Sequence, residues 1–153
     1  ADEATYNLHI MIRYEIEKQL ISGESEVDEL PDLWDSMYEE FLGIKSSNRS
    51  KGVLQDIHWS MGAIGYFPTY TLGNLYAAQL LEAAKKELPN HEDQIRCGEF
   101  QPLLNWMRKN VHSRGSVLEP AALIEEATGS PPSPDAFVDY LSSKIERLYG
   151  VTA

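Results

Sequence analysis

The 153-residue chain is long enough for one ordinary domain, and 42% apolar residues with 10% aromatic residues supply material for a folded core. Its formal net charge of −11 repels phosphate backbones and anionic lipid, and no basic stripe offsets that charge locally. No apolar run approaches the roughly 20 residues of a membrane span, and the single cysteine, Cys97, has no disulfide partner within the chain. We therefore expect a cytoplasmic globular protein without nucleic acid or membrane partners.

The first twenty residues read as if the chain starts inside a helix, with no initiator Met and no signal-peptide pattern. Either a removed leader or a piece of a longer protein explains this start. Apolar residues at three- and four-residue spacing predict a core face that ends near Ser22 and Gly23: Leu8, Met11, Ile12, Ile16, Leu20. Tyr6, Ile10 and Tyr14 form a second stripe. A helix that is apolar on two sides requires burial on both, so in a piece of a protein we expect this second stripe to be exposed or covered by another copy.

A second helix is predicted from Asp28, an N-cap residue, to Gly43, a good left-handed C′ residue. Its core face is expected to comprise Leu30, Leu33, Trp34, Met37, Tyr38 and Phe41. The stretch 44–71 shows no clean helical stripe but is rich in aromatic residues and glycine. It predicts one long functional loop, because a loop this apolar is not disordered.

A third helix is predicted over about Thr71 to Leu88, and Asn90 is expected to cap a short fourth one. The segment EFQPLLNWMRKNVH predicts a fifth, which ends near Gly115. Before PAALIEEATG we expect a capping box of Ser116 and Glu119, and before the last helix an N-cap at Ser133 with Pro134 as first residue. The inward face of that last helix is predicted to hold Phe137, Tyr140, Leu141, Ile145 and Leu148. The fold class is all-α, an irregular bundle of about six or seven helices forming a single helical unit over 1–153.

The four histidines, at positions 9, 58, 91 and 112, have no second ligand at a metal-site spacing in their own helices. No complete HExxH motif is present; the segment His91-Glu92-Asp93-Gln94-Ile95 carries Ile95 where the second histidine would stand. We interpret it as a charged helix start. His9 and His112 are expected to be structural, and no metal is expected to be bound by this chain.

His58 differs because it lies within Gln55–Trp59, in the irregular apolar segment and close to several phenols. Polar groups gathered in such a loop suggest a ligand surface, while a buried polar knot that satisfies loop backbone groups is an equal alternative. Tyr66 and Tyr70 are weighed in the same way, as packing residues or as hydrogen-bond donors. Cys97 stands between Arg96 and a glycine with no histidine next to it in sequence, so a cysteine hydrolase is disfavoured.

The stretch GVLQDIHWSMGAIGYFPTYTLGNLYAAQ resembles the thermostable (Taq-type) metallocarboxypeptidase family. That family's motif GxxQDxHW is matched by Gly52, Gln55, Asp56, His58 and Trp59. A second family motif, IRxxAD, would end at Ala1 and Asp2. The similarity extends over essentially all 153 residues.

The resemblance implies an enzyme that removes residues one at a time from peptide C-termini with a divalent metal, zinc or cobalt. Two histidines of an HExxH helix and a downstream glutamate would hold that metal, in long, mostly helical homodimers with a deep groove. All of these ligands would precede residue 1. The chain would then be a C-terminal portion that is inactive alone, has the missing N-terminal portion as its partner and lines the groove with residues 44–71.

Within this resemblance, His58 is expected to hydrogen bond the scissile carbonyl or the peptide terminus. Tyr66 and Tyr70 are candidate donors in the same pocket, and Asp56 with Gln55 is expected to orient His58 or a ligating imidazole. The arginine of IRxxAD is the natural clamp for the terminal carboxylate of the substrate. The alternative is a non-enzymatic helical module that binds a peptide or a partner. An HExxH motif upstream in the gene distinguishes the two.

Overall fold

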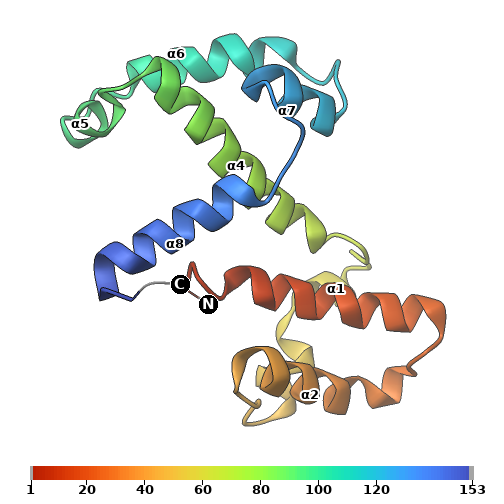
Figure 1. Ribbon diagram of the computed structural model, residues 1–153. Helices are drawn as coiled ribbons and strands as arrows, with labels where there is room; N and C mark the ends of the chain where they lie inside the picture. Colours follow the sequence, from red (N-terminus) through yellow and green to blue (C-terminus); the bar gives the residue numbers. More distant parts are fainter. Residues whose placement is uncertain (1, 152–153) are drawn as a thin grey trace. The chain divides into compact units, whose positions relative to one another are not determined.

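The computed structural model describes residues 2–151, which form helices joined by turns without any strand (Figure 1). The α-helices are α1 (Tyr6–Ser22), α2 (Leu30–Leu42), α3 (Ile57–Ser60), α4 (Pro68–Glu87), α5 (His91–Arg96), α6 (Gln101–Asn110), α7 (Pro120–Thr128) and α8 (Asp135–Tyr149). The all-α prediction is confirmed. None of these helices is long and apolar enough to cross a membrane.

The described chain gathers into two compact units, one up to Leu72 and one from Gly73 onward. Helix α4 contributes residues to both of them. The single helical unit over 1–153 stays a prediction.

The core of the first unit lies between α1 and α2, where Ile12 and Ile16 are fully buried against Trp34. The Trp34 ring stacks on Tyr38 with ring centroids 4.5 Å apart and meets Trp59 edge-on at 6.0 Å. This packing confirms the aromatic core face predicted for α2. Such aromatic pairs stabilise a core by more than the area that they bury.

The predicted boundaries of the first unit need four corrections. Residues 2–5 form a turn before α1, because the Asp2 carboxylate accepts a hydrogen bond from the backbone N–H of Thr5 at 2.8 Å. Helix α2 follows a 3₁₀ turn at Val27–Glu29, in which Glu29 accepts from the N–H of Glu26, so Asp28 is not the N-cap. The expected loop 44–71 contains 3₁₀ turns at Arg49–Lys51 and Val53–Gln55 as well as α3. Helix α4 already begins at Pro68, whose fixed φ suits a first helical turn.

The second unit is organised around Gln79 of α4, a polar side chain that is almost fully buried. Its amide nitrogen donates to the carbonyls of Pro131 and Ser130, at 2.9 and 3.2 Å, and its oxygen accepts from the N–H of Ser133 at 3.2 Å. Gln79 thereby fixes the connection between α7 and α8. Trp106 of α6 is also buried and donates its indole N–H to Glu87 at 2.9 Å.

The helix caps of the second unit differ in part from the sequence prediction. The Ser133 hydroxyl does accept a hydrogen bond from the N–H of Asp135, as expected of a capping residue. Helix α8 begins at Asp135, however, so the N-cap residue is Pro134, one residue later than predicted. Asn90 and Glu119 make no side-chain capping bond, so the predicted cap and capping box there are wrong. On α8 the predicted inward face is partly wrong as well, because Tyr140 and Leu148 are exposed whereas Phe137, Leu141 and Ile145 are half-buried.

We expect Gln79→Ala to lower the free energy of unfolding of the second unit by about 1 to 2 kcal/mol, because it leaves the Ser133 N–H and the two carbonyls without their shared partner. Chemical denaturation followed by amide hydrogen exchange measures the loss. Gln101→Ala is the matched control, since Gln101 is exposed and its amide donates to Asn105, an exposed residue of the same helix. Equal effects of the two substitutions would contradict the anchoring role of Gln79.

Candidate functional site

A pocket of about 620 Å³ opens in the first unit between α1, α2 and the segment that follows α2. Among the predicted site residues its lining includes Gln55, Asp56, His58 and Tyr70. Gln55 is exposed there. The pocket is also lined by four α1 residues, namely Tyr6, His9, Ile10 and Arg13.

His58 lies on the single turn of α3 and is enclosed by aromatic rings from the start of α4 and the residues before it. Its Nε2 lies 3.0 Å from the hydroxyl of Tyr70. The Phe67 ring lies 4.6 Å from the imidazole, and the Tyr66 ring lies 6.1 Å away and nearly parallel. The structure thus brings together three of the predicted site residues, although Tyr66 is half-exposed and lies outside the pocket lining.

The other nitrogen of His58, Nδ1, is buried and has no hydrogen-bond partner among residues 2–151. Among the described residues the His58 side chain therefore bonds no loop backbone group, which the alternative of a buried polar knot would require of it. A buried polar atom without a partner costs free energy. The Nδ1 of His58, a residue that lines the pocket, is therefore a buried polar atom that the described residues leave unsatisfied.

Asp56 is held by Arg13 and not by His58. The Arg13 Nε donates to the Asp56 carboxylate at 2.7 Å, with 8% and 18% of the two side chains exposed. The same guanidinium donates to the backbone carbonyl of His9 and to the Tyr38 hydroxyl, and it lies 4.7 Å from the Trp34 ring centroid. Among residues 2–151 neither nitrogen of His58 bonds Asp56, since Nε2 faces the Tyr70 hydroxyl and Nδ1 has no partner, and the orientation of His58 or of a ligating imidazole by Asp56 with Gln55 stays a prediction.

Glu17 of α1 is a residue of this region that the sequence did not single out. Its carboxylate is buried and accepts two hydrogen bonds, from the Trp59 indole N–H at 2.9 Å and from the Gly65 backbone N–H at 3.0 Å. The sequence signal that could have identified Glu17 is its position next to Ile16, on a helix predicted to be buried on two sides. A charged residue at such a position needs a partner.

The electrostatics of the pocket couple His9 to Tyr38. Burial, and next the nearby Arg13 charge, lower the pKa of His9, while burial raises the pKa of Tyr38 despite Arg13. The Tyr38 oxygen accepts from Arg13 at 2.9 Å and lies 3.0 Å from the His9 Nδ1, where the direction of the hydrogen bond depends on the tautomer of His9. His9 of α1 thus packs against Tyr38 of α2, with ring centroids 5.3 Å apart.

A family profile described as carboxypeptidase Taq (M32) metallopeptidase matches residues 1–145. The chain belongs to this family. Thermostable carboxypeptidase 1 of Thermus thermophilus is 48% identical over 150 residues, which cover 98% of this chain and 29% of that protein. Carboxypeptidase 1 of Bacillus subtilis is 45% identical over 149 residues, which cover 97% of this chain and 30% of that protein.

The crystal structure of an M32 carboxypeptidase from Deinococcus radiodurans R1 is similar at a TM-score of 0.95 and 40% identity, over 99% of this chain and 31% of that one. The resemblance found in the sequence is therefore confirmed. The chain spans less than a third of the length of the M32 relatives that it matches.

The metal implied by M32 membership does not find a complete ligand set in this part of the chain. Among residues 2–151 no three side chains of histidine, cysteine, aspartate or glutamate converge as metal ligands. Near His58, the Asp56 carboxylate is bound to Arg13, and the Glu17 carboxylate accepts from one indole N–H and one backbone N–H. One free imidazole nitrogen does not make a catalytic metal site, which takes three protein ligands.

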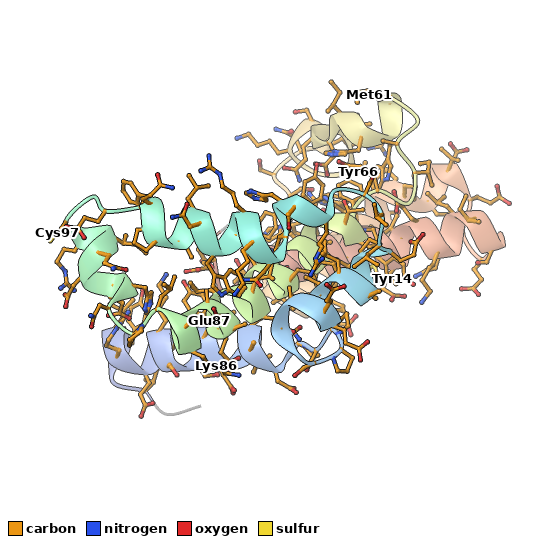
Figure 2. All side chains as sticks on the ribbon, turned by 90° about the horizontal axis from the view of Figure 1, so that it is seen from above. Tyr14, Met61, Tyr66, Lys86, Glu87 and Cys97 are labelled. Carbon is orange, nitrogen blue, oxygen red and sulfur yellow. The ribbon has the colours of Figure 1, made fainter. Side chains whose placement is uncertain are left out.

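Apolar side chains are exposed around the M32 motif, as expected for a surface covered in a longer protein. Large exposed apolar residues in this stretch are Leu54, Ile57, Met61, Ile64 and Tyr66. Figure 2 shows the Met61 side chain projecting away from the ribbon. On α1 the expectation is met only in part, because Tyr14 is 44% exposed, Tyr6 is half-buried and Ile10 is buried. Met11, predicted for the core face, is exposed instead.

The pKa of His9 predicts how stability depends on pH. A folded-state pKa below the unfolded value of about 6.5 means that the unfolded chain binds more protons, so stability is present above that pH and is lost as the pH falls below it. We expect the free energy of unfolding to fall between about pH 7.5 and about pH 5.5, and to fall less in His9→Gln. Urea titrations at each pH measure this slope. His112→Gln, at an exposed histidine, is the control, and a His9→Gln slope as steep as that of the control would contradict the interpretation.

Proposed function

We propose that this chain is the substrate-gripping part of a metal-dependent carboxypeptidase that releases single residues from peptide C-termini. The observation that carries the proposal is the buried, unpartnered Nδ1 of His58 in the pocket of a chain that belongs to the M32 family. An exopeptidase must hold the end of a peptide, whose carbonyl and carboxylate oxygens are hydrogen-bond acceptors. A protonated Nδ1 would satisfy itself by donating to one of them.

Tyr70 would determine which nitrogen of His58 carries the proton. When the Tyr70 hydroxyl donates to Nε2, that nitrogen is an acceptor and the neutral ring carries its proton on Nδ1. His58 is then a fixed donor toward the scissile carbonyl or the peptide terminus. Such a donor accelerates acyl transfer when it stabilises the negative charge that develops on the carbonyl oxygen.

The remaining predicted site residues take supporting roles. Gln55 lies exposed on the pocket lining, where its amide would contact the peptide, and Tyr66 would border the His58 ring. Asp56 would act on the substrate indirectly, because its carboxylate is bound to Arg13. Arg13 is occupied by that ion pair. The clamp for the terminal carboxylate would therefore come from another cation, for which the arginine of an IRxxAD motif is the candidate.

The metal, zinc or cobalt, would be held by an N-terminal portion of the same protein and would supply the activated water. We propose for the whole protein a homodimeric state and a cytoplasmic location. An HExxH motif upstream in the gene would support this function over a non-enzymatic binding module. Its absence would contradict the proposal.

In the longer enzyme that contains this chain, we expect His58→Ala to lower turnover by roughly 10²-fold at unchanged metal content, the scale of one lost transition-state donor. Tyr70→Phe should lower turnover less, by roughly tenfold, because the ring stays while the tautomer of His58 is no longer fixed. Steady-state kinetics on a short peptide and metal analysis by atomic absorption measure both effects. Tyr149→Phe, at an exposed tyrosine, is the control. Unchanged turnover in His58→Ala would remove His58 from the site.

We expect the 153-residue chain alone to bind neither zinc nor cobalt tightly, because its described part brings no three ligands together. Equilibrium dialysis against each ion, followed by metal analysis, measures the binding. Stoichiometric metal with nanomolar affinity would contradict the assignment of the metal ligands to another segment.

A further inference from the structure

We propose that Glu17 of α1 is a positioning residue for His58, acting together with Arg13. The two residues lie one helical turn apart, and both are buried. Each holds a residue close to His58 in the chain: Arg13 binds Asp56, two residues before His58, and Glu17 binds Trp59, which directly follows it. The inference rests on the proposed function only in that His58 is taken as the group that touches substrate.

The need for such anchors follows from the shortness of α3. A helix of four residues has at most one turn of backbone hydrogen bonds, which does not sustain a helix without tertiary contacts. Its N-cap residue Asp56 makes no side-chain capping bond, because its carboxylate is turned to Arg13. The orientation of α3, and with it the direction of the His58 ring, therefore depends on contacts from other elements.

The Glu17 carboxylate binds the chain on both sides of His58, in α3 and in the segment before α4. One carboxylate oxygen accepts from Trp59, which directly follows His58, and the other accepts from the backbone N–H of Gly65. Gly65 directly precedes Tyr66 and Phe67, whose rings contact the imidazole. At Gly65 the backbone has φ of 79°, a left-handed conformation that glycine adopts without strain. Glu17 thus sets the distance between α3 and the aromatic residues that enclose His58.

The chemistry of Glu17 argues for positioning and against a simple gain in stability. A buried carboxylate that is satisfied by neutral donors carries a desolvation cost that a neutral side chain would avoid. Glutamine would fit the same volume, yet it offers one acceptor oxygen where Glu17 offers two. Only a carboxylate at this position receives Trp59 and Gly65 together.

The decisive test is a double-mutant cycle between Glu17→Gln and His58→Ala in the longer enzyme. Glu17→Gln alone should lower kcat/KM by about tenfold, in the range expected for a displaced reacting group. Glu17→Gln added to His58→Ala should cause no further loss, because the side chain that it positions is gone. Glu15→Gln, at an exposed glutamate of the same helix that pairs with Lys18, is the matched control and should leave kcat/KM unchanged.

A second readout separates this inference from the proposed function. Nitrogen-15 NMR of the 153-residue chain reports the tautomer of His58 without any need for activity. Glu17→Gln should change the tautomer populations of His58, while Glu15→Gln should leave them as in the parent chain. If His58→Ala leaves turnover intact but the NMR change is seen, the proposed role of His58 fails and the positioning stands. An unchanged His58 signal in Glu17→Gln, or equal losses from Glu17→Gln with and without His58, would overturn the inference.

Discussion

The burial of charged side chains on α1 is the constraint around which the first unit is built. Arg13 and Glu17 stand beside Ile12 and Ile16, so the helix cannot bury its isoleucines without taking both charges out of water. An unpaired charge in that position is strongly unfavourable, and each therefore requires a partner from elsewhere. The segment that follows α2 supplies those partners, Asp56 for one charge and two N–H donors for the other. A stretch with little regular structure of its own is thereby held against α1.

The sequence predicted the helices well where apolar periodicity was long and where glycine ended them. Gly23 and Gly43 do end α1 and α2, and both have the left-handed backbone expected of them. The predictions failed at helix starts, where several polar residues compete to cap the first turn. Glu29, and not Asp28, closes the turn before α2 because its longer side chain reaches back to the N–H of Glu26. Such competition is decided by local geometry that residue type alone does not reveal.

The sequence predicted several residues of the candidate site, but it did not predict the hydrogen bonds and ion pair that hold them. His58 and the two tyrosines stood out in the sequence itself and the motif gave their neighbours, and the structure brings His58, Tyr66 and Tyr70 together. The partner of Asp56 lies 43 residues away in the sequence, and no periodicity links the two. Glu17 escaped notice because a single glutamate on a helix is usually solvated. Its burial follows from the packing of α1 against distant segments, which sequence spacing does not report.

The unpaired nitrogen of His58 also bears on selectivity between similar ligands. Because this atom has already been removed from water in the folded chain, its desolvation does not oppose association. With the proton on Nδ1, as proposed, a molecule that brings an oxygen acceptor would gain a hydrogen bond there, whereas an isostere with a methylene group in the same place would leave the nitrogen unsatisfied. The difference amounts to about 1 to 3 kcal/mol per such atom, or roughly tenfold to a hundredfold in affinity. The pocket would therefore rank its ligands by their acceptor groups even before any chemical step begins.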